Sequence, residues 1–324
     1  MKLLVIIPAY NEEESIGLVI KEIPRQIEGV NKVEVLVIDD GSVDKTVQLA
    51  KGAGADYVFS NKTNRGLSFS FKRGLEEALK LGADIIVNTD ADFQYDQSEI
   101  VKLIQPILQD KADLVFGDRQ IKKIDHMSLK NKYGNIIGSF FLRLITGSNI
   151  IDASSGFRAF SKKSAMQFSI FSDHTYTHET IIQAVDKRMR LAQIPVTFRK
   201  RQTGQSRLIR GFFKHIERSL LVIVKVVLIY KPLKVFFILG GVNFLLGILI
   251  GLRYLYFFFI GGAGGHIQSL ILASILISIG VIIIVMGLLA DLINTNRKII
   301  EEILLRLRKK DYQKKNYKRD NQKE

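Results

Sequence analysis

Residues 84–94 read DIIVNTDADFQ, an apolar run that ends in two acidic residues. The run Asp84–Asn88 is short and rich in β-branched residues, as in a buried strand, and Asp90 and Asp92 come just after it. Two carboxylates this close repel each other unless a cation lies with them, and oxygen ligands suit Mg²⁺ or Mn²⁺. The stretch therefore predicts a strand whose carboxyl end carries a divalent-cation site, with Gln94 as a third oxygen donor.

Apolar and amphipathic segments alternate around this strand. The pattern predicts strands at residues 3–7, 33–38, 57–60, 84–88 and 114–117, and helices at residues 12–23, 43–52, 67–81 and 98–109. Such alternation is typical of an α/β domain with a parallel sheet and helices on both of its faces. Ligands of these sheets bind at the carboxyl ends of the strands, which is where functional side chains are expected.

Two further polar clusters follow the first two expected strands. Pro8, Tyr10 and Glu12 belong to the cluster after the first strand, and Asp39 and Asp40 begin the cluster after the second. The two aspartates suit either the cap of the next helix or the binding of a ribose or a base, and two carboxylates allow both roles. With the acidic residues after residue 88, these clusters are expected to converge on one edge of the sheet.

Composition excludes several classes of protein. The 324 residues contain no Cys, which rules out disulfide scaffolds, thiolate metal sites and cysteine nucleophiles. No glycine-rich dinucleotide motif or P-loop motif follows the first strand.

The positive charge of the chain predicts the kind of partner. The formal net charge of +15 favours a polyanionic partner, and basic residues are dense between residues 187 and 218. Because this stretch has no interleaved aromatic platform, acidic lipid or a phosphorylated substrate is favoured and nucleic acid is not expected.

Residues 211–294 are overwhelmingly apolar. Val235–Leu252 and Ile267–Ala290 contain no charged residue, and a bilayer core of about 30 Å needs about 20 helical residues. The sequence therefore predicts a transmembrane hairpin with helices at about 232–260 and 267–292, and a pair of buried core helices is the alternative. Gly247 and Gly251 have the spacing of close helix packing, with which a homo-oligomer is consistent.

The flanks of the hairpin predict its orientation and the division of the chain. Lysines and arginines lie on both flanks and the connecting loop has only His266, so the positive-inside rule places both termini and the N-terminal domain in the cytoplasm. The expected parts are a cytoplasmic domain (1–210), a basic amphipathic helix in the membrane interface (211–231), the hairpin (232–294) and a basic cytoplasmic tail (295–324). For 211–231 the alternative is an ordinary helix packed on the domain core. The tail is expected to stay helical to about Lys310 and to be unstructured beyond it.

Six motifs occur in order along the first 210 residues. They are VIIPAYNEEESI, VIDDGSVDKT, NRGLSFSFKRG, TDADFQYDQSEI, DASSGFRAFSK and IPVTFRKRQTGQSR. In this order they resemble glycosyltransferase family 2, and within it the polyprenyl-phosphate glycosyltransferases, such as dolichyl-phosphate mannosyl synthases and bacterial undecaprenyl-phosphate glucosyl transferases. The resemblance implies a GT-A fold, a Rossmann-like nucleotide-sugar-binding domain, with Mg²⁺ or Mn²⁺ as cofactor. It also implies a nucleotide-sugar donor, GDP-mannose or UDP-glucose, and a polyprenyl phosphate acceptor in the membrane.

The resemblance also implies roles for the residues that match the family's motifs. The nucleotide-sugar site would comprise Pro8, Tyr10, Glu12, Asp39, Asp90, Ala91, Asp92, Arg119, Arg201 and Arg207. The metal ligands would be Asp90, Asp92 and Gln94. The catalytic residues would be Asp92, Asp152, Arg119 and Arg158. The family's ER-x-x-G-x-SK segment is KRQTGQSR here, where Lys200 replaces the acidic residue and Arg207 replaces lysine, a different kind of phosphate ligand.

The charges of these substrates predict the mechanism. Negative charge grows on the leaving nucleoside diphosphate, where a divalent cation with Arg201 or Arg207 would stabilise it. The acceptor phosphate is already largely ionised at neutral pH, so it needs alignment and partial neutralisation rather than a strong base. Arg119 and Arg158 could supply both through bidentate contacts, with Asp152 as an orienting residue or a base. The alternatives are an internal salt bridge for Arg158 and a turn or helix cap for Asp152.

The functional expectation is inverting transfer of a single sugar from a nucleotide sugar to a polyprenyl phosphate at the cytoplasmic face of a membrane. One alternative is another membrane-bound family 2 enzyme, such as a processive polysaccharide synthase. Such enzymes carry a Q-x-x-R-W motif, and the chain has no Trp. A second alternative is a membrane scaffold that keeps the fold without catalysis, against which the acidic residues and Arg201 argue.

Overall fold

In a computed structural model, the protein is described over residues 1–170 except 126 and 128, residues 176–200, residue 228, residues 232–261 and residues 267–320. The chain divides into two compact units. The first comprises Met1–Val224 with Leu304–Glu324, and the second comprises Lys225–Ile303. Apart from residue 228, the interface helix expected over residues 211–231 lies outside the described residues.

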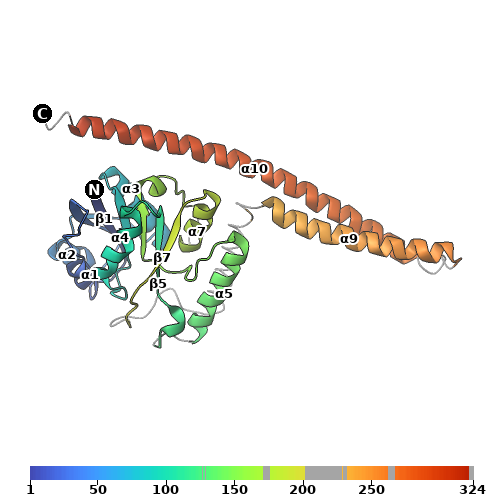
Figure 1. Ribbon diagram of the computed structural model, residues 1–324, viewed down its shortest axis with the longest axis horizontal. Helices are drawn as coiled ribbons and strands as arrows, with labels where there is room; N and C mark the ends of the chain where they lie inside the picture. Colours follow the sequence, from blue (N-terminus) through green and yellow to red (C-terminus); the bar gives the residue numbers. More distant parts are fainter. Residues whose placement is uncertain are drawn as a thin grey trace. The chain divides into compact units, whose positions relative to one another are not determined.

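The first unit is built on a seven-stranded sheet with the order β3-β2-β1-β4-β6-β5-β7 (Figure 1). The strands are β1 (Lys2–Ala9), β2 (Lys32–Asp39), β3 (Tyr57–Ser60), β4 (Ile85–Asn88), β5 (Leu114–Asp118), β6 (Arg158–Ser161) and β7 (Leu191–Pro195). Neighbouring strands are parallel except at β6, which is antiparallel to both β4 and β5. The expectation of a parallel sheet is therefore wrong at β6. The chain between β5 and β6 stays at the carboxyl edge of β5, so β6 enters the sheet in the opposite direction.

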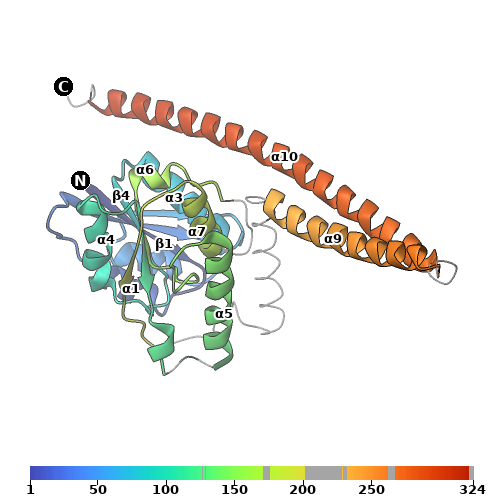
Figure 2. The same cartoon turned by 45° about the vertical axis from the view of Figure 1, so that its right-hand side comes forward.

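Helices cover both faces of this sheet, as expected (Figures 1 and 2). They are α1 (Ile16–Glu22), α2 (Thr46–Gly52), α3 (Leu67–Lys80), α4 (Ile100–Leu108), α5 (Leu129–Thr146), α6 (Lys162–Ala165) and α7 (Thr177–Asp186), with short 3-10 turns η1 (Gln97–Glu99) and η2 (Ile121–Lys123). Leu3 and Val5 of β1 share a core with residues of α1 and α4. Ile6, on the other face, lies under α3 at Gly74, where a Cβ would be 3.4 Å from the Ile6 Cδ1 atom. Because both faces are buried, the central strands are apolar without alternation.

Strand direction determines where the polar loops meet. β1, β2, β4, β5 and β7 point the same way, so their carboxyl ends lie at one edge of the sheet, and the amino end of β6 lies there too. The strand order reverses beside β1, because the chain continues from β1 to β2 and β3 and then returns to β4 on the other side. Ligands of open α/β sheets bind at such a switch point.

The second unit contains one long apolar helix and the apolar part of another. The most apolar 18-residue stretch of α9 (Pro232–Phe259) has a mean hydropathy of 2.5, and the corresponding stretch of α10 (Ile267–Asp320), which lies within residues 267–308, has 2.9. Both helices are long and apolar enough to cross a membrane, which fits a membrane protein. In α9 the buried residues are Pro232, Gly240 and Gly247, and most of the large apolar side chains are exposed, which disfavours the alternative of a buried core pair. α10 continues as one helix to Asp320, so the expected loss of helix near Lys310 is wrong.

α9 and α10 lie side by side (Figures 1 and 2). Glycines bring their backbones into contact. A Cβ on Gly240 would lie 2.7 Å from the Gly280 carbonyl oxygen, and a Cβ on Gly280 would lie 2.8 Å from the Gly240 carbonyl oxygen. Gly247 and Gly287 lie seven residues from these two and are equally tight, with a neighbouring atom 2.7 Å and 2.6 Å away. Gly251 has its nearest neighbouring atom at 3.8 Å. The close approach therefore uses a seven-residue spacing inside the hairpin, rather than the four-residue pair expected from the sequence.

Candidate active site

The loops after β1 and β2 are tied together at the carboxyl edge of the sheet. The backbone N–H of Asn11 donates to the Ser42 Oγ atom at 2.9 Å, and the backbone N–H of Val43 donates to the Asn11 Oδ1 atom at 2.9 Å. The backbone N–H of Glu12 donates to the Thr46 Oγ1 atom at 2.8 Å. Asn11 itself has φ of 50°, a left-handed conformation that asparagine tolerates better than most residues. These bonds hold the two polar loops in one fixed arrangement.

The residues predicted to bind the nucleotide lie together on these loops. Pro8 is buried near the end of β1, and Tyr10 and Glu12 are partly exposed just beyond it. Asp39 ends β2 with 2% exposure, and its Oδ1 atom accepts the backbone N–H of Ser42 at 3.0 Å. The structure thus brings all four to the switch point of the sheet.

The Asp40 carboxylate is occupied by hydrogen bonds within the protein. Its Oδ1 atom accepts the side-chain amide of Asn61 at 2.7 Å and the backbone N–H of Arg65 at 3.0 Å, and its Oδ2 atom accepts the backbone N–H of Gly66 at 2.7 Å. Of the two neighbouring aspartates, Asp40 therefore fixes the loop before α3. Asp39 stays the predicted ligand of a ribose or a base.

The acidic loop after β4 brings two carboxylates together. Asp90 packs against Gly156, where an added Cβ would lie 2.7 Å from the Asp90 Oδ1 atom. The Asp92 Oδ1 atom accepts the backbone N–H of Gln94 at 3.2 Å, across Phe93, whose φ is 60°. Burial, followed by the nearby charge of Asp92, raises the pKa of Asp90 to about 7.

These residues fit a divalent cation bound jointly with a substrate. Among the described residues, no group of three or more His, Asp or Glu side chains could form a complete cage. Mg²⁺ and Mn²⁺ are commonly held by one or two carboxylates together with substrate phosphates and water. Burial, and then the charge of Asp92, raise the pKa of Asp90, and a bound cation would oppose both effects. Gln94 uses its amide nitrogen to donate to the Arg199 carbonyl oxygen at 3.4 Å, and its oxygen stays a predicted ligand. Asp90 and Asp92 are thus the carboxylates that would hold the metal.

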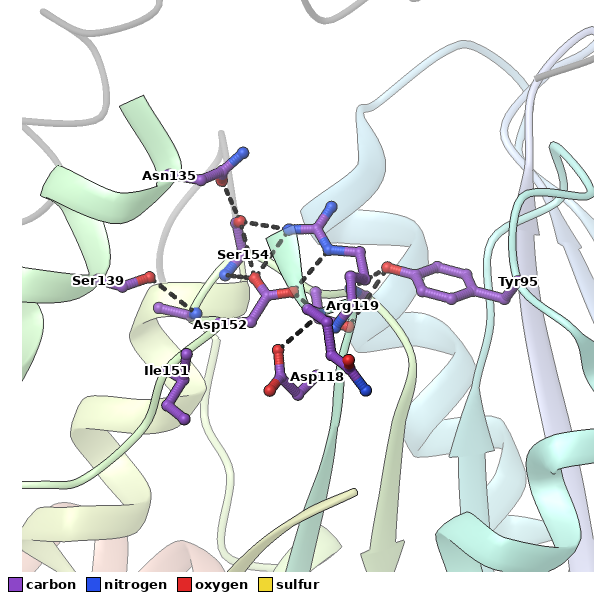
Figure 3. A network of polar contacts seen from close by, with 12 residues as sticks. Tyr95, Asp118, Arg119, Asn135, Ser139, Ile151, Asp152 and Ser154 are labelled. Carbon is purple, nitrogen blue, oxygen red and sulfur yellow. Dashed lines mark hydrogen bonds and ion pairs between the residues drawn. The ribbon is translucent and has the colours of Figure 1, made fainter. Parts of the chain in front are cut away.

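Arg119 and Asp152 form a buried bidentate ion pair at the same edge (Figure 3). The Arg119 Nε atom donates to the Asp152 Oδ2 atom at 2.7 Å, and its Nη2 atom donates to the Oδ1 atom at 2.8 Å. The same Nη2 atom also donates to the Ser154 Oγ atom at 2.6 Å. Burial alone would raise the pKa of Asp152, but the Arg119 guanidinium outweighs burial and holds it below its ordinary value. Asp152 is therefore an ionised orienting group for Arg119 and a poor base.

Helix α5 supports this ion pair from one side (Figure 3). The Ser154 hydroxyl donates to the Asn135 Oδ1 atom, and the Ser139 Oγ atom accepts the backbone N–H of Ala153 at 3.1 Å. Tyr95 supports the loop from the other side, where its hydroxyl accepts the backbone N–H of Gly156 at 3.1 Å. The loop that carries Asp152 is thus held between α5 and the acidic-loop segment.

Arg158 has an internal position that does not fit the predicted contact with a phosphate. It begins β6 with 0% exposure. Its guanidinium donates to the carbonyl oxygens of Ala153 at 2.9 Å, Ser155 at 2.8 Å and Thr177 at 2.7 Å, and to the Thr180 hydroxyl. Burial lowers its pKa to about 10. The alternative of an internal role is therefore favoured, with carbonyl oxygens as partners in place of the carboxylate of a salt bridge.

Sequence reasoning missed Asn88 and Tyr176, which lie behind the acidic loop. The Asn88 Nδ2 atom donates to the Gly156 carbonyl oxygen at 2.7 Å and to the Tyr176 hydroxyl at 2.8 Å. Tyr176 stacks on Phe71, with ring centroids 3.8 Å apart. A polar residue at the end of an otherwise apolar strand was the available signal for Asn88. Nothing in the sequence links Tyr176 to this loop.

A cavity of about 420 Å³ opens beside Arg119. Its lining combines cationic Arg119 and Lys123 with apolar Ile124, Val196 and Phe198, and also includes Glu99, Gln120, Asp125, Pro195 and Thr197. The Arg119 guanidinium lies 5.2 Å from the ring centroid of Phe198. The Glu99 carboxylate is paired with Lys102 at 3.3 Å and accepts the backbone N–H of Thr197 at 2.7 Å, so the lining joins cationic, acidic and apolar side chains in one cavity. Predicted residues Arg201 and Arg207 lie outside the described residues, and Lys200 is exposed.

Comparisons with known proteins agree with this geometry. The family model described as glycosyl transferase family 2 matches residues 4–168. The chain is 31% identical over 212 residues to a UDP-N-acetylglucosamine–dolichyl-phosphate N-acetylglucosaminyltransferase of Methanococcus voltae, over 59% of this chain and 83% of that protein. It is 29% identical over 221 residues to an undecaprenyl-phosphate mannosyltransferase of Micrococcus luteus, over 65% of this chain and 89% of that protein.

Among solved structures, the fold is similar to glucosyl-3-phosphoglycerate synthase of Mycobacterium tuberculosis, crystallised with Mn²⁺, UDP-glucose and phosphoglyceric acid. The TM-score is 0.54 at 22% identity, over 68% of this chain and 79% of that chain. Likeness at this level of identity concerns the fold alone. It confirms the GT-A fold expected from the sequence.

Proposed function

The chain is a member of glycosyltransferase family 2, and on this basis we propose that it transfers a single sugar from a nucleotide sugar to a polyprenyl phosphate, with inversion, at the cytoplasmic face of a membrane. The relatives named above are polyprenyl-phosphate sugar transferases, and the two apolar helices fit the same setting. The proposal assigns the donor to the loops after β1, β2 and β4. It assigns the acceptor to the cavity beside Arg119.

The observation that carries the acceptor assignment is the Arg119–Asp152 pair, whose arginine lines the cavity. Burial alone would lower the pKa of Arg119, but Asp152 raises it, so the guanidinium stays charged. A polyprenyl phosphate has one anionic group on an apolar chain. The cavity offers the cations Arg119 and Lys123 beside apolar side chains, and of its two carboxylates Glu99 is already paired with Lys102. Asp152 fixes the guanidinium plane, so the phosphate is aligned by a group that does not need to reorganise.

On the donor side, Asp90 and Asp92 would hold Mg²⁺ or Mn²⁺ against the diphosphate. A bound cation would supply electrostatic stabilisation of the leaving nucleoside diphosphate. The remaining steps belong to the chain's own residues. Tyr10, Glu12 and Asp39 position the nucleotide, and Arg119 orients the acceptor oxygen toward the sugar. The acceptor phosphate is itself the nucleophile, so the lowered pKa of Asp152 is compatible with the reaction.

The exposed face of α5 supports an acceptor that arrives from a membrane. Tyr133, Ile137, Phe140 and Leu144 form an apolar stripe on α5 with exposures between 52% and 68%. Their spacing of 4, 3 and 4 residues places them on one side of the helix. The opposite side holds Asn135 and the loop of Asp152. We infer that this stripe lies in the lipid interface, with the acceptor site directly behind it.

The experiment that tests the proposal is a donor screen on the purified protein in detergent. UDP-glucose, UDP-N-acetylglucosamine and GDP-mannose are each paired with undecaprenyl and dolichyl phosphate, with Mn²⁺ or Mg²⁺ and then with EDTA. Lipid-linked product from one donor, lost in EDTA, is expected. Absence of product and of nucleotide binding with every donor would refute the proposal and favour a scaffold.

A further inference from the structure

Arg199 links three segments of the donor side. The Arg199 Nη1 and Nη2 atoms donate to the Glu22 Oε2 and Oε1 atoms at 3.0 and 2.8 Å, which forms a bidentate pair with the end of α1. The Nη2 atom also lies 2.9 Å from the Asp96 Oδ2 atom, at the end of the acidic loop. Charge-assisted bidentate pairs of this kind fix geometry as well as adding energy.

The backbone of Arg199 is joined to the same acidic loop. Its N–H donates to the Gln94 carbonyl oxygen at 2.7 Å, and its carbonyl oxygen accepts the Gln94 side-chain amide at 3.4 Å. An isolated antiparallel bridge joins the neighbouring residues Tyr95 and Phe198. The segment after β7 is therefore paired with the loop that holds the predicted metal ligands.

The backbone of Phe93, within the acidic loop, is in a strained conformation. Its φ of 60° is in the left-handed region, which is unfavourable for a bulky residue and persists only when the surroundings enforce it. The Arg199 guanidinium lies over its ring, 4.9 Å from the centroid. Asp92 precedes Phe93 and Gln94 follows it, so relaxation of Phe93 would move two of the three predicted metal ligands.

We propose that Arg199 is a positioning residue for the donor site, which holds the acidic loop in its strained, metal-binding conformation through Glu22, Asp96 and Phe93. The inference rests on the proposed function, because it assumes that the loop binds a metal with a nucleoside diphosphate. Arg199 itself need not touch either ligand. Its effect passes through the position of Asp92.

The test measures binding rather than turnover, on the full chain in detergent. Free Mn²⁺ is followed by electron paramagnetic resonance, and UDP or GDP binding in its presence is followed by calorimetry. Arg199→Ala is expected to weaken Mn²⁺–nucleotide binding by about tenfold, the scale of one relaxed backbone strain. Arg199→Lys keeps the charge without the fork and is expected to restore part of the loss.

Arg190→Ala is the matched control. Arg190 lies at the other end of β7, where its Nη2 atom contacts the Asp110 Oδ1 atom at 2.6 Å and the Asp113 Oδ1 atom at 3.2 Å. Its loss removes a similar pair of ionic contacts far from the acidic loop, so binding should match the wild type. Equal binding by both alanine variants, or an equal loss in both, would overturn the positioning role. If the wild type bound neither nucleotide with Mn²⁺, the donor site itself would be refuted, and this inference with it.

Discussion

Two arginines of the same sheet edge have opposite environments. Arg119 has a carboxylate partner, 10% side-chain exposure and a cavity beside it. Arg158 has 0% exposure, and its donors are used by carbonyl oxygens and a hydroxyl. Both were predicted to bind the acceptor phosphate, because the resemblance to the family implied a catalytic role for each. The sequence could not separate them, since burial of a guanidinium depends on the loops that close over it.

Asp92 gives the most direct residue-scale prediction. Asp92→Asn removes one of the two carboxylate charges that would hold the metal, while it keeps nearly the same shape. Sugar transfer should fall by at least about 100-fold, as expected for loss of a group that stabilises the transition-state charge. The thermal midpoint should stay within a few degrees of the wild type. Near-normal turnover measured with purified protein would rule out Asp92 as a ligand.

Gly156 provides a steric test of the same loop. Gly156→Ala would place a Cβ 2.7 Å from the Asp90 Oδ1 atom and 3.1 Å from the Tyr176 hydroxyl, so Asp90 must move. Mn²⁺ binding should weaken by about tenfold or more, measured by paramagnetic resonance. Gly138→Ala is the control, because no atom lies within 4 Å of an added Cβ there. Unchanged Mn²⁺ binding in Gly156→Ala would argue against Asp90 as a ligand.

The raised pKa of Asp90 predicts a pH dependence. The carboxyl group must lose its proton to bind a metal, so Mn²⁺ affinity should fall as the pH drops below about 7. Without metal the sign is opposite, because a carboxyl whose pKa is raised by folding destabilises the protein as the pH rises from about 4 to about 7. Asp90→Asn should therefore raise the stability of the metal-free protein by roughly 1–3 kcal/mol at neutral pH. A pH-independent Mn²⁺ affinity between pH 5.5 and 8 would contradict this assignment.

At the scale of elements, α5 has one face on the active-site loop and one apolar face exposed. Phe140→Glu should weaken transfer to long-chain polyprenyl phosphate in vesicles by roughly tenfold, because it places a charge on the face assigned to the lipid interface. Transfer to a short, water-soluble prenyl phosphate should change little, since the residues facing Asp152 are untouched.

Leu49→Glu on α2 is the control for general effects, since Leu49 is also an exposed apolar side chain, at 41% exposure. The long-chain and the short acceptor are each assayed with the wild type, Phe140→Glu and Leu49→Glu. Equal losses with the long and the short acceptor would show that the α5 stripe has no specific relation to the membrane.

The hairpin offers a second element-scale prediction. Gly280→Leu should separate α9 from α10, because a Cβ there would meet the Phe244 backbone nitrogen at 2.7 Å. The cost should be in the range of about 1–3 kcal/mol that overpacking typically brings. Gly241→Leu is the matched control, with no atom within 4 Å of an added Cβ.

The chain has no Cys, so engineered cysteine pairs across α9 and α10 can report the separation by disulfide formation. Cross-linking should fall in the Gly280→Leu background and persist in the Gly241→Leu background. Equal cross-linking in both would mean that the glycine contacts do not hold the hairpin together.

At the scale of the whole molecule, local patterns predicted most of the first half of the chain. The strand expected at residues 33–38 is β2 (Lys32–Asp39), and the helix expected at 67–81 is α3 (Leu67–Lys80). Such elements follow from hydrophobic periodicity, which is local. The direction of β6 was missed because it depends on the edge of the sheet at which the chain enters again after α5. Strand pairing of this kind is not a local property.

The site shows the same division. The acidic residues after β4 could be predicted from the pattern, because the ends of strands converge wherever a parallel sheet forms. The arginine after β5 was implied by the resemblance to the family. Three other contacts join residues between 5 and 177 positions apart. They are the Arg119–Asp152 pair, the hydrogen bonds of buried Arg158 and the ion pair of Arg199 with Glu22. Those contacts follow from tertiary packing and could not be derived from spacing alone.

The central claim is that one sugar is moved from a nucleotide onto a lipid phosphate, and mass spectrometry of the lipid product tests it most directly. The wild-type protein, reconstituted in vesicles with polyprenyl phosphate, a nucleotide sugar and Mn²⁺, should yield the polyprenyl phosphate mass plus a single sugar residue. The product should vanish in EDTA and with Asp92→Asn. A lipid that carries several sugars, or free sugar released without any lipid product, would contradict the account.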